Sequence, residues 1–324
     1  MNKKRWWALA IFLVLLVIWI SSAGRVEKTG LMSYINSVED QPYTTQIYQE
    51  GTGKTLAMIR LNGTIIDNSG TSTGMDDGYD HQSFLGQLED AFSQDNIKGV
   101  IIRVNSPGGG VYESDEIYKC LLDLKKTYHK PLVVYMEQEA ASGGYYISMA
   151  ADRIYANRNT LTGSIGVIMR TYNYQELANK IGIQDITFKS GTNKDLLNPM
   201  RPVSDAEKVI VQSLVHESYG FFVDAVAKGR NMDRSQVLKL ADGRIYSGSQ
   251  AKSLGLVDEV GYLDDAINGT AVLAHTKDPQ IILYQNTGSP FLDWISSVKA
   301  PALNLLGLKQ QMQQELKPEL LYLA

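Results

Sequence analysis

Short apolar runs alternate with segments of helical spacing along most of this chain, beginning near Thr55. The apolar runs at residues 99–104 and 131–136 predict buried strands. Apolar residues with helical spacing predict helices over residues 81–92 and 114–126. Because strands that alternate with helices favour parallel pairing with right-handed crossovers, the pattern predicts an α/β fold.

The alternation continues with shorter pieces to about residue 284. Further strands are predicted at residues 55–61, 153–156, 165–169 and 185–189, and further helices at residues 174–181 and about 205–228. A polar loop, residues 190–203, leads into the last of these helices. Ser204 and Glu207 form a capping-box pattern there, which predicts where that helix begins.

The N-terminal segment is uncharged over the 19 residues 6–24. A helix of that length spans about 28 Å, close to the ~30 Å of a bilayer core. The basic residues at positions 3–5 precede it, which predicts that the rest of the chain lies outside the cytoplasm. Cleavage after Ala23, as in a signal peptide, is the alternative. Because the apolar stretch exceeds that of a usual signal peptide, we predict an uncleaved, single-pass anchor in the cell membrane.

Composition shifts divide the chain into five predicted regions. Residues 1–5 form a cytoplasmic tip, 6–24 the transmembrane anchor and 25–53 a polar linker. Residues 54–285 carry the globular pattern, and we interpret residues 286–324 as a C-terminal tail containing three prolines and a glutamine-rich patch.

Composition also excludes several classes of function. The net charge is −4, and no basic run interleaves with aromatic residues, so we expect no nucleic-acid partner. With Cys120 as the single cysteine, an intrachain disulfide cannot form. The four histidines are scattered without metal-ligand spacing, and we expect neither a metal nor a cofactor.

The stretch EAASGGYYI, residues 139–147, is the most unusual part of the chain. A predicted strand delivers Ser142 to a turn that opens a helix, and two glycines in a first helical turn cost roughly 1 kcal/mol each relative to alanine. Such a helix start presents unpaired N–H groups that suit a developing oxyanion. We therefore consider Ser142 a candidate nucleophile and the Gly143 N–H an oxyanion donor. The alternative is a tight strand-to-helix turn without chemistry.

A serine nucleophile needs a base, and no histidine is well placed along the sequence. A lysine can replace histidine where burial leaves it neutral near pH 7. The candidates before the long helix are Lys180, Lys189 and Lys194. Lys194 lies in the polar loop after a predicted strand, and that loop could fold over the site. The alternative is a solvated loop lysine.

Four motifs occur together in the order of one known family. They are NSPGGG at residues 105–110, AASGGYY at 140–146, TGSIG at 162–166 and the pair Lys194-Asp195. In this respect the chain resembles the signal peptide peptidase A (SppA) family, short form, of the Clp protease/crotonase-like superfamily. The resemblance covers about residues 56–267 and the N-terminal anchor.

The resemblance implies roles for particular residues. It implies that Ser142 is the nucleophile and Lys194 the general base, that the backbone N–H groups of Gly143 and Gly109 form the oxyanion hole, and that Ser164 orients the lysine. It also implies a spiral of ββα units and, because only one copy of each motif is present, a homo-oligomer, with an octamer suspected.

The function implied is that of a membrane-anchored serine endopeptidase. Its expected substrates are remnant signal peptides and other short apolar peptides. Three alternatives remain: a related membrane-bound Ser-Lys protease acting on membrane proteins, a non-catalytic crotonase-like scaffold that binds peptides, and a crotonase-type acyl-CoA enzyme, which would not need Ser142 or Lys194.

Overall fold

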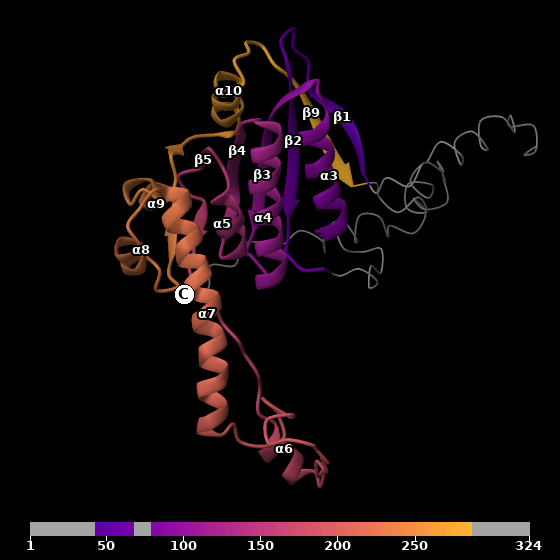
Figure 1. Cartoon of the computed structure of the whole chain (residues 1–324), viewed down its shortest axis with the longest axis vertical. Coiled ribbons are helices and arrows are strands. Elements are labelled where there is room, and N and C mark those ends of the chain that lie inside the picture. The colour runs from indigo at the N-terminus through magenta and orange to yellow at the C-terminus, as the bar shows by residue number, and fades with distance from the viewer. Residues whose placement is uncertain (1–42, 68–78, 287–324) are drawn as a thin grey trace, which may run out of the picture. The chain divides into compact units, whose positions relative to one another are not determined.

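The fold is built on one mixed β-sheet, seen in a computed structural model that describes residues 43–67 and 79–286 (Figure 1). Within these residues the sheet has nine strands, in the order β1-β9-β2-β3-β4-β5-β8, with β6 paired to β4 and β7. The strands are β1 (Tyr43–Gln49), β2 (Thr55–Asn62), β3 (Ile97–Ser106), β4 (Leu132–Ala141), β5 (Arg153–Ala156), β6 (Leu161–Gly163), β7 (Ile245–Ser247), β8 (Glu259–Val260) and β9 (Gln280–Asn286).

Helices connect most of these strands. They are α3 (His81–Ser93), α4 (Val111–Tyr128), α5 (Gly143–Ser148), α6 (Gln175–Lys180), α7 (Asp205–Arg230), α8 (Arg234–Leu240), α9 (Gly248–Ser253) and α10 (Leu263–Leu273). The strands β2, β3, β4 and β5 pair in parallel, each with the next, as crossover helices require. The predicted α/β class is therefore confirmed.

Alternate residues of the central strands face two different helix layers. In β2, Ile59 and Leu61 join the cluster that includes α3, α4 and α5, whereas Leu56 and Met58 join the cluster with α10. All four side chains are fully buried. Burying one such side chain stabilises the fold by about 1.5–3 kcal/mol, so both layers hold the sheet and fix the ends of its strands.

The helix α7 is long, and only its last part packs on the sheet layers. Its 26 residues span about 39 Å. Its buried apolar side chains lie between Phe222 and Val226, and the ring of Phe222 stands 5.1 Å from that of Tyr146 in α5. The capping box of Ser204 and Glu207 is present, as predicted. The start of α7 extends away from the sheet, with α6 near it (Figure 1).

Residues 166–214, which we call the arm, are largely exposed. Of these residues only Ala178 and Glu207 are buried. Many of the exposed side chains are large and apolar, and they include Ile168, Tyr172, Leu177, Ile181, Ile186, Phe188 and Val209. The exposed fraction of Phe188 reaches 94%. Such a surface is unusual for a chain that acts alone.

Two predicted strands are wrong, and both lie at or within the arm. Residues 165–169 and 185–189 are apolar enough to suggest strands, but neither pairs with another strand of the described chain. A strand needs a neighbour to bind its backbone groups, and residues 185–189 are all exposed. The strand that pairs with β4 lies earlier, at Leu161–Gly163.

A strand also occurs inside the range predicted to be a linker. Tyr43–Gln49 forms β1, antiparallel to β9, although its side chains are mostly exposed and show no apolar alternation. No helix within the described ranges is long and apolar enough to cross a bilayer. The predicted tip and anchor, residues 1–24, lie outside these ranges, as do residues 287–324 of the predicted tail.

Candidate active site

Ser142 lies between the end of β4 and the start of α5, in a strained conformation. Its φ of 51° and ψ of −117° lie where non-glycine residues are rare. Strain of this kind costs on the order of 1–3 kcal/mol and persists only where the surroundings enforce it. The Ser142 N–H donates to the Gly163 carbonyl at 2.9 Å, and its carbonyl accepts from the Tyr146 N–H at 2.8 Å. Both neighbours therefore fix the turn that presents this serine.

The glycine loop after β3 touches the same turn. Gly108 has a φ of 98°, and a Cβ there would lie 2.5 Å from the Gly143 nitrogen and 2.8 Å from the Ser142 Cβ. Only glycine permits this approach. Ile65 secures the loop, because its N–H donates to the Gly108 carbonyl at 2.9 Å and its carbonyl accepts from the Gly110 N–H at 2.8 Å.

The backbone N–H groups of Gly109 and Gly143 lie next to Ser142 and are not used by the contacts described above. The bridge to Ile65 uses the backbone on either side of Gly109 but not the Gly109 N–H. That nitrogen lies 3.2 Å from where a Cβ on Gly143 would stand. Among the described residues, neither the Gly109 nor the Gly143 N–H has an acceptor. Adjacent unpaired donors beside a serine can stabilise negative charge that develops on a substrate oxygen.

The strand β6 brings Ser164 close to Ser142, at the carboxyl end of β4. Ala141 and Gly163 are paired at the ends of β4 and β6, and Ser142 and Ser164 are the residues that directly follow them. The Ser164 N–H donates to the Arg244 carbonyl at 2.9 Å, and the residue has a φ of 50°. Four of the five predicted site residues thus lie together.

Lys194, the fifth, lies on the arm. It is exposed, its N–H donates to the Gly191 carbonyl at 3.1 Å, and its Nζ has no hydrogen-bond partner in the described part of the chain. The rival Lys189 is occupied, since its Nζ donates to Asp195 Oδ1 at 2.7 Å. No contact within one chain joins either lysine to Ser142 across the described ranges.

Histidine is the usual base for a serine nucleophile. The buried His81 has both ring nitrogens engaged, Nδ1 with the Tyr79 hydroxyl and Nε2 with Glu116 Oε2 at 2.8 Å. Across the described residues, none of the four histidines is bonded to Ser142. The sequence likewise places none of the four histidines well as a base for Ser142.

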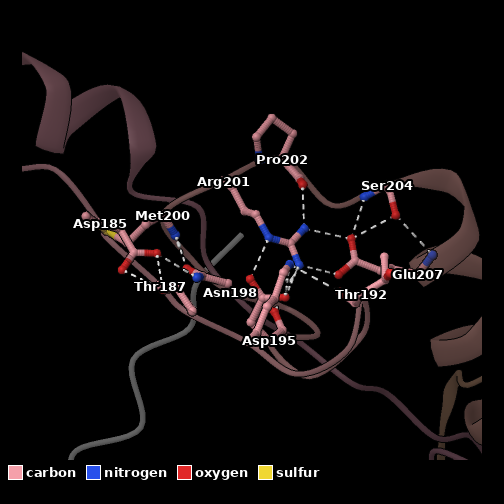
Figure 2. A network of polar contacts seen from close by, with 11 residues as sticks. Asp185, Thr187, Thr192, Asp195, Asn198, Met200, Arg201, Pro202, Ser204 and Glu207 are labelled. Carbon is pink, nitrogen blue, oxygen red and sulfur yellow. Dashed lines mark hydrogen bonds and ion pairs between the residues drawn. The ribbon is translucent and has the colours of Figure 1, made fainter.

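A polar network around Arg201 holds the loop that carries Lys194 (Figure 2). The guanidinium bonds the carboxylates of Asp195 and Glu207, and Lys189 adds a further bond to Asp195. The bonds from Arg201 and Lys189 hold the pKa of Asp195 well below its ordinary value. From the sequence we predicted only a polar loop here. Lys189, Asp195, Arg201 and Glu207 follow one another at intervals of six residues. Such a spacing does not predict contact between side chains in an irregular loop.

Glu207 gives this network a measurable pH dependence. Its pKa is lowered from 4.5 to about 2, first by its bonds to Arg201 and then by the Ser204 backbone. A lowered carboxyl pKa contributes stability that is full above the unfolded value and is lost as the pH falls toward the folded one. We expect Glu207→Gln to lower the melting temperature at pH 7, and the difference from wild type to shrink between pH 4.5 and about 2. A difference that stays constant over this range in thermal melts would contradict the assignment.

A serine on a strained strand-to-helix turn beside unpaired N–H donors is the arrangement of enzymes that transfer acyl groups through a serine. The sequence comparisons agree and are more specific. The model of peptidase family S49 matches residues 124–277, a range that includes Ser142, Ser164 and Lys194. The chain belongs to this family and is a serine peptidase.

Relatives in several organisms support the assignment. An Enterococcus faecium protein named "Putative signal peptide peptidase SppA" is 39% identical over 92% of this chain and 89% of its own length. "Protease 4" of Haemophilus influenzae is 35% identical over 75% of this chain but only 39% of its own length. "Serine protease SPPA, chloroplastic" of Arabidopsis thaliana is 34% identical over 65% of this chain and 31% of its own length.

Proposed function

We propose that this chain is a membrane-anchored endopeptidase in which Ser142 and Lys194 form a catalytic dyad. The observation that carries the proposal is the meeting of the strained Ser142 with the unpaired N–H groups of Gly143 and Gly109. Each oxyanion donor of this kind is typically worth about 2.7–4 kcal/mol of transition-state stabilisation.

The proposed reaction has two halves. Neutral Lys194 takes the proton of the Ser142 hydroxyl while Oγ bonds to the peptide carbonyl carbon. The N–H groups of Gly143 and Gly109 hold the resulting oxyanion. As the C–N bond breaks, Lys194 gives the proton to the leaving amine. Water then attacks the acyl-enzyme, Lys194 takes its proton and returns it to Ser142, and Ser164 orients the lysine throughout.

The dyad requires a second copy of the chain in this proposal. Ser142 stands at the sheet edge, whereas Lys194 is exposed on the arm and has no contact with Ser142 in the same chain. The exposed apolar side chains of the arm provide a surface that another copy would cover. We therefore propose a closed homo-oligomer in which each arm brings Lys194 to the Ser142 of a neighbour. The mixed sheet fits a Clp protease-like fold, and we propose the associated spiral of ββα units.

The proposed substrates are apolar peptides, such as remnant signal peptides. Two observations support this class: the name of the Enterococcus relative, and the uncharged segment at residues 6–24 of this chain. An anchor there would hold the domain next to peptides left in the membrane, on the extracytoplasmic side.

Peptide hydrolysis by the full-length chain in detergent micelles tests this function. We expect cleavage of a synthetic signal-peptide fragment at pH 6–10 and much slower cleavage of a charged peptide of equal length. Equal rates for the two peptides would contradict the apolar substrate class. Absence of cleavage together with hydrolysis of an acyl-CoA thioester would favour the crotonase-type alternative.

A further inference from the structure

We infer that Arg201 is a positioning residue for catalysis: it holds the loop that carries Lys194 in the geometry needed for proton transfer. The inference rests on the proposed role of Lys194 as the base. It assigns to Arg201 a function that is separate from the folding of the sheet domain, because the network lies on the arm.

Besides Arg201, Lys189 also holds the loop around Lys194, because its Nζ donates to the Thr192 carbonyl at 3.2 Å and to Asp195 Oδ1 at 2.7 Å. Residues 190–194 are all exposed, and a Cβ on Gly191 would meet no atom of the described chain within 4 Å. Its own backbone bonds are short-range turns, such as the bond from the Asn198 N–H to the Asp195 carbonyl at 3.0 Å. Leu196 and Leu197 are only half-buried, so the position of Lys194 depends mainly on the polar contacts that fix its neighbour Asp195.

Arg201 holds both the side chain and the backbone of Asp195. Its Nε donates to Asp195 Oδ2 at 3.0 Å, and its Nη2 donates to Oδ1 at 2.9 Å. The same Nη2 donates to the Asp195 carbonyl oxygen at 3.0 Å. A bidentate contact of this kind fixes orientation as well as distance, which a lysine at position 201 cannot do.

The other side of the guanidinium is attached to the start of α7. Its Nη1 donates to Glu207 Oε2 at 2.9 Å and its Nη2 to Oε1 at 2.6 Å. Glu207 is 2% exposed and also accepts from the Ser204 N–H at 2.8 Å, within the capping box. Figure 2 shows the resulting chain of contacts, in which Arg201 lies between Asp195 and Glu207. The residue next to Lys194 is thereby connected to the start of α7 through the Arg201 side chain.

Proton transfer is sensitive to such positioning. A displacement of about 1 Å can cost on the order of 100-fold in rate. Arg201 also balances the charge of Asp195 next to Lys194. Removing that positive charge leaves the Asp195 carboxylate less compensated and favours the protonated form of the neighbouring lysine. Loss of Arg201 should therefore change both the rate and its pH dependence.

The experiment compares four variants of the full-length chain by pH profiles of kcat and KM on the apolar peptide. Arg201→Met removes the bidentate contact and its charge, whereas Arg201→Lys keeps the charge. Lys208→Met is the matched control, because Lys208 pairs with Asp205 at the same helix start but does not touch Asp195. Lys194→Ala reports on the proposed base itself. Oligomer mass is measured by light scattering for every variant.

We expect Arg201→Met to lower kcat on the order of 100-fold with little change in KM, and to move the acid limb of the profile to higher pH. Arg201→Lys should lower kcat less and leave the limb in place, and Lys208→Met should match wild type. Wild-type kinetics for Arg201→Met, or a loss of activity that accompanies loss of assembly, would overturn the inference while leaving the dyad intact. If Lys194→Ala keeps near-normal activity, the proposed base is wrong and the inference falls with it.

Discussion

Ser142→Ala is expected to abolish peptide hydrolysis, with a fall in kcat on the order of 10⁶-fold, as for other serine peptidases that lose their nucleophile. The fold should survive, because alanine retains the Cβ that already occupies the strained φ of 51°. The measurement is kcat on the apolar peptide, with melting temperature and oligomer mass as checks on the fold.

The matched control is Ser253→Ala, which removes an exposed hydroxyl whose one hydrogen bond among the described residues goes to the Ser249 carbonyl of its own helix. This variant should keep wild-type kinetics. A Ser142→Ala variant that retained more than about one hundredth of the wild-type kcat would contradict this role. The general acid–base and oxyanion groups that remain accelerate the reaction by only about 10²–10⁴-fold each, so another residue would have to form the acyl-enzyme.

The second large effect is expected for Lys194. Lys194→Ala should lower kcat by about 10²–10⁴-fold, the usual contribution of a general base. Lys180→Ala is the control, because Lys180 ends α6 on the same arm and was a rival candidate from its position in the sequence. Equal losses for the two variants in kinetic assays would show that the arm is sensitive to any lost lysine and would remove the case for a specific base.

Mixing inactive chains tests where the lysine comes from. If the dyad forms between copies, mixed assemblies of Ser142→Ala and Lys194→Ala chains regain activity, because roughly a quarter of randomly formed junctions pair an intact serine with an intact lysine. If each dyad forms within one chain, mixing restores nothing. The chains must be dissociated and reassembled together, and each variant alone serves as the baseline.

Much of the sheet domain could be predicted from the sequence. The strands β3 and β4 and the helices α3, α4 and α7 are marked by apolar runs, helical spacing and a capping box, and these signals are local. The predicted strands on the arm failed for the opposite reason. Residues such as Ile186 and Phe188 are apolar yet exposed. The apolar pattern, which ordinarily predicts a buried strand, was therefore misleading there.

The candidate site was also only partly predictable. The glycines of the two turns pointed to Ser142, Gly143 and Gly109, because glycine is unfavourable in a helix start unless the backbone there must approach another group closely. The bridge from Ile65, which frees the Gly109 N–H, joins residues 44 apart and leaves no local signal. The contacts of Arg201 with Asp195 and Glu207 were missed for a similar reason, since they depend on how an irregular loop folds back on a helix start.

The central claim is that Ser142 is a nucleophile activated by Lys194, and the rate of covalent labelling tests it most directly. A fluorophosphonate probe is added to wild type and to Lys194→Ala across pH 6–10, and the adduct is located by peptide mass spectrometry. We predict one adduct, on Ser142, that forms faster as the pH rises in wild type and much more slowly in Lys194→Ala. An adduct on another residue, or equal labelling rates in the two proteins, would contradict the claim.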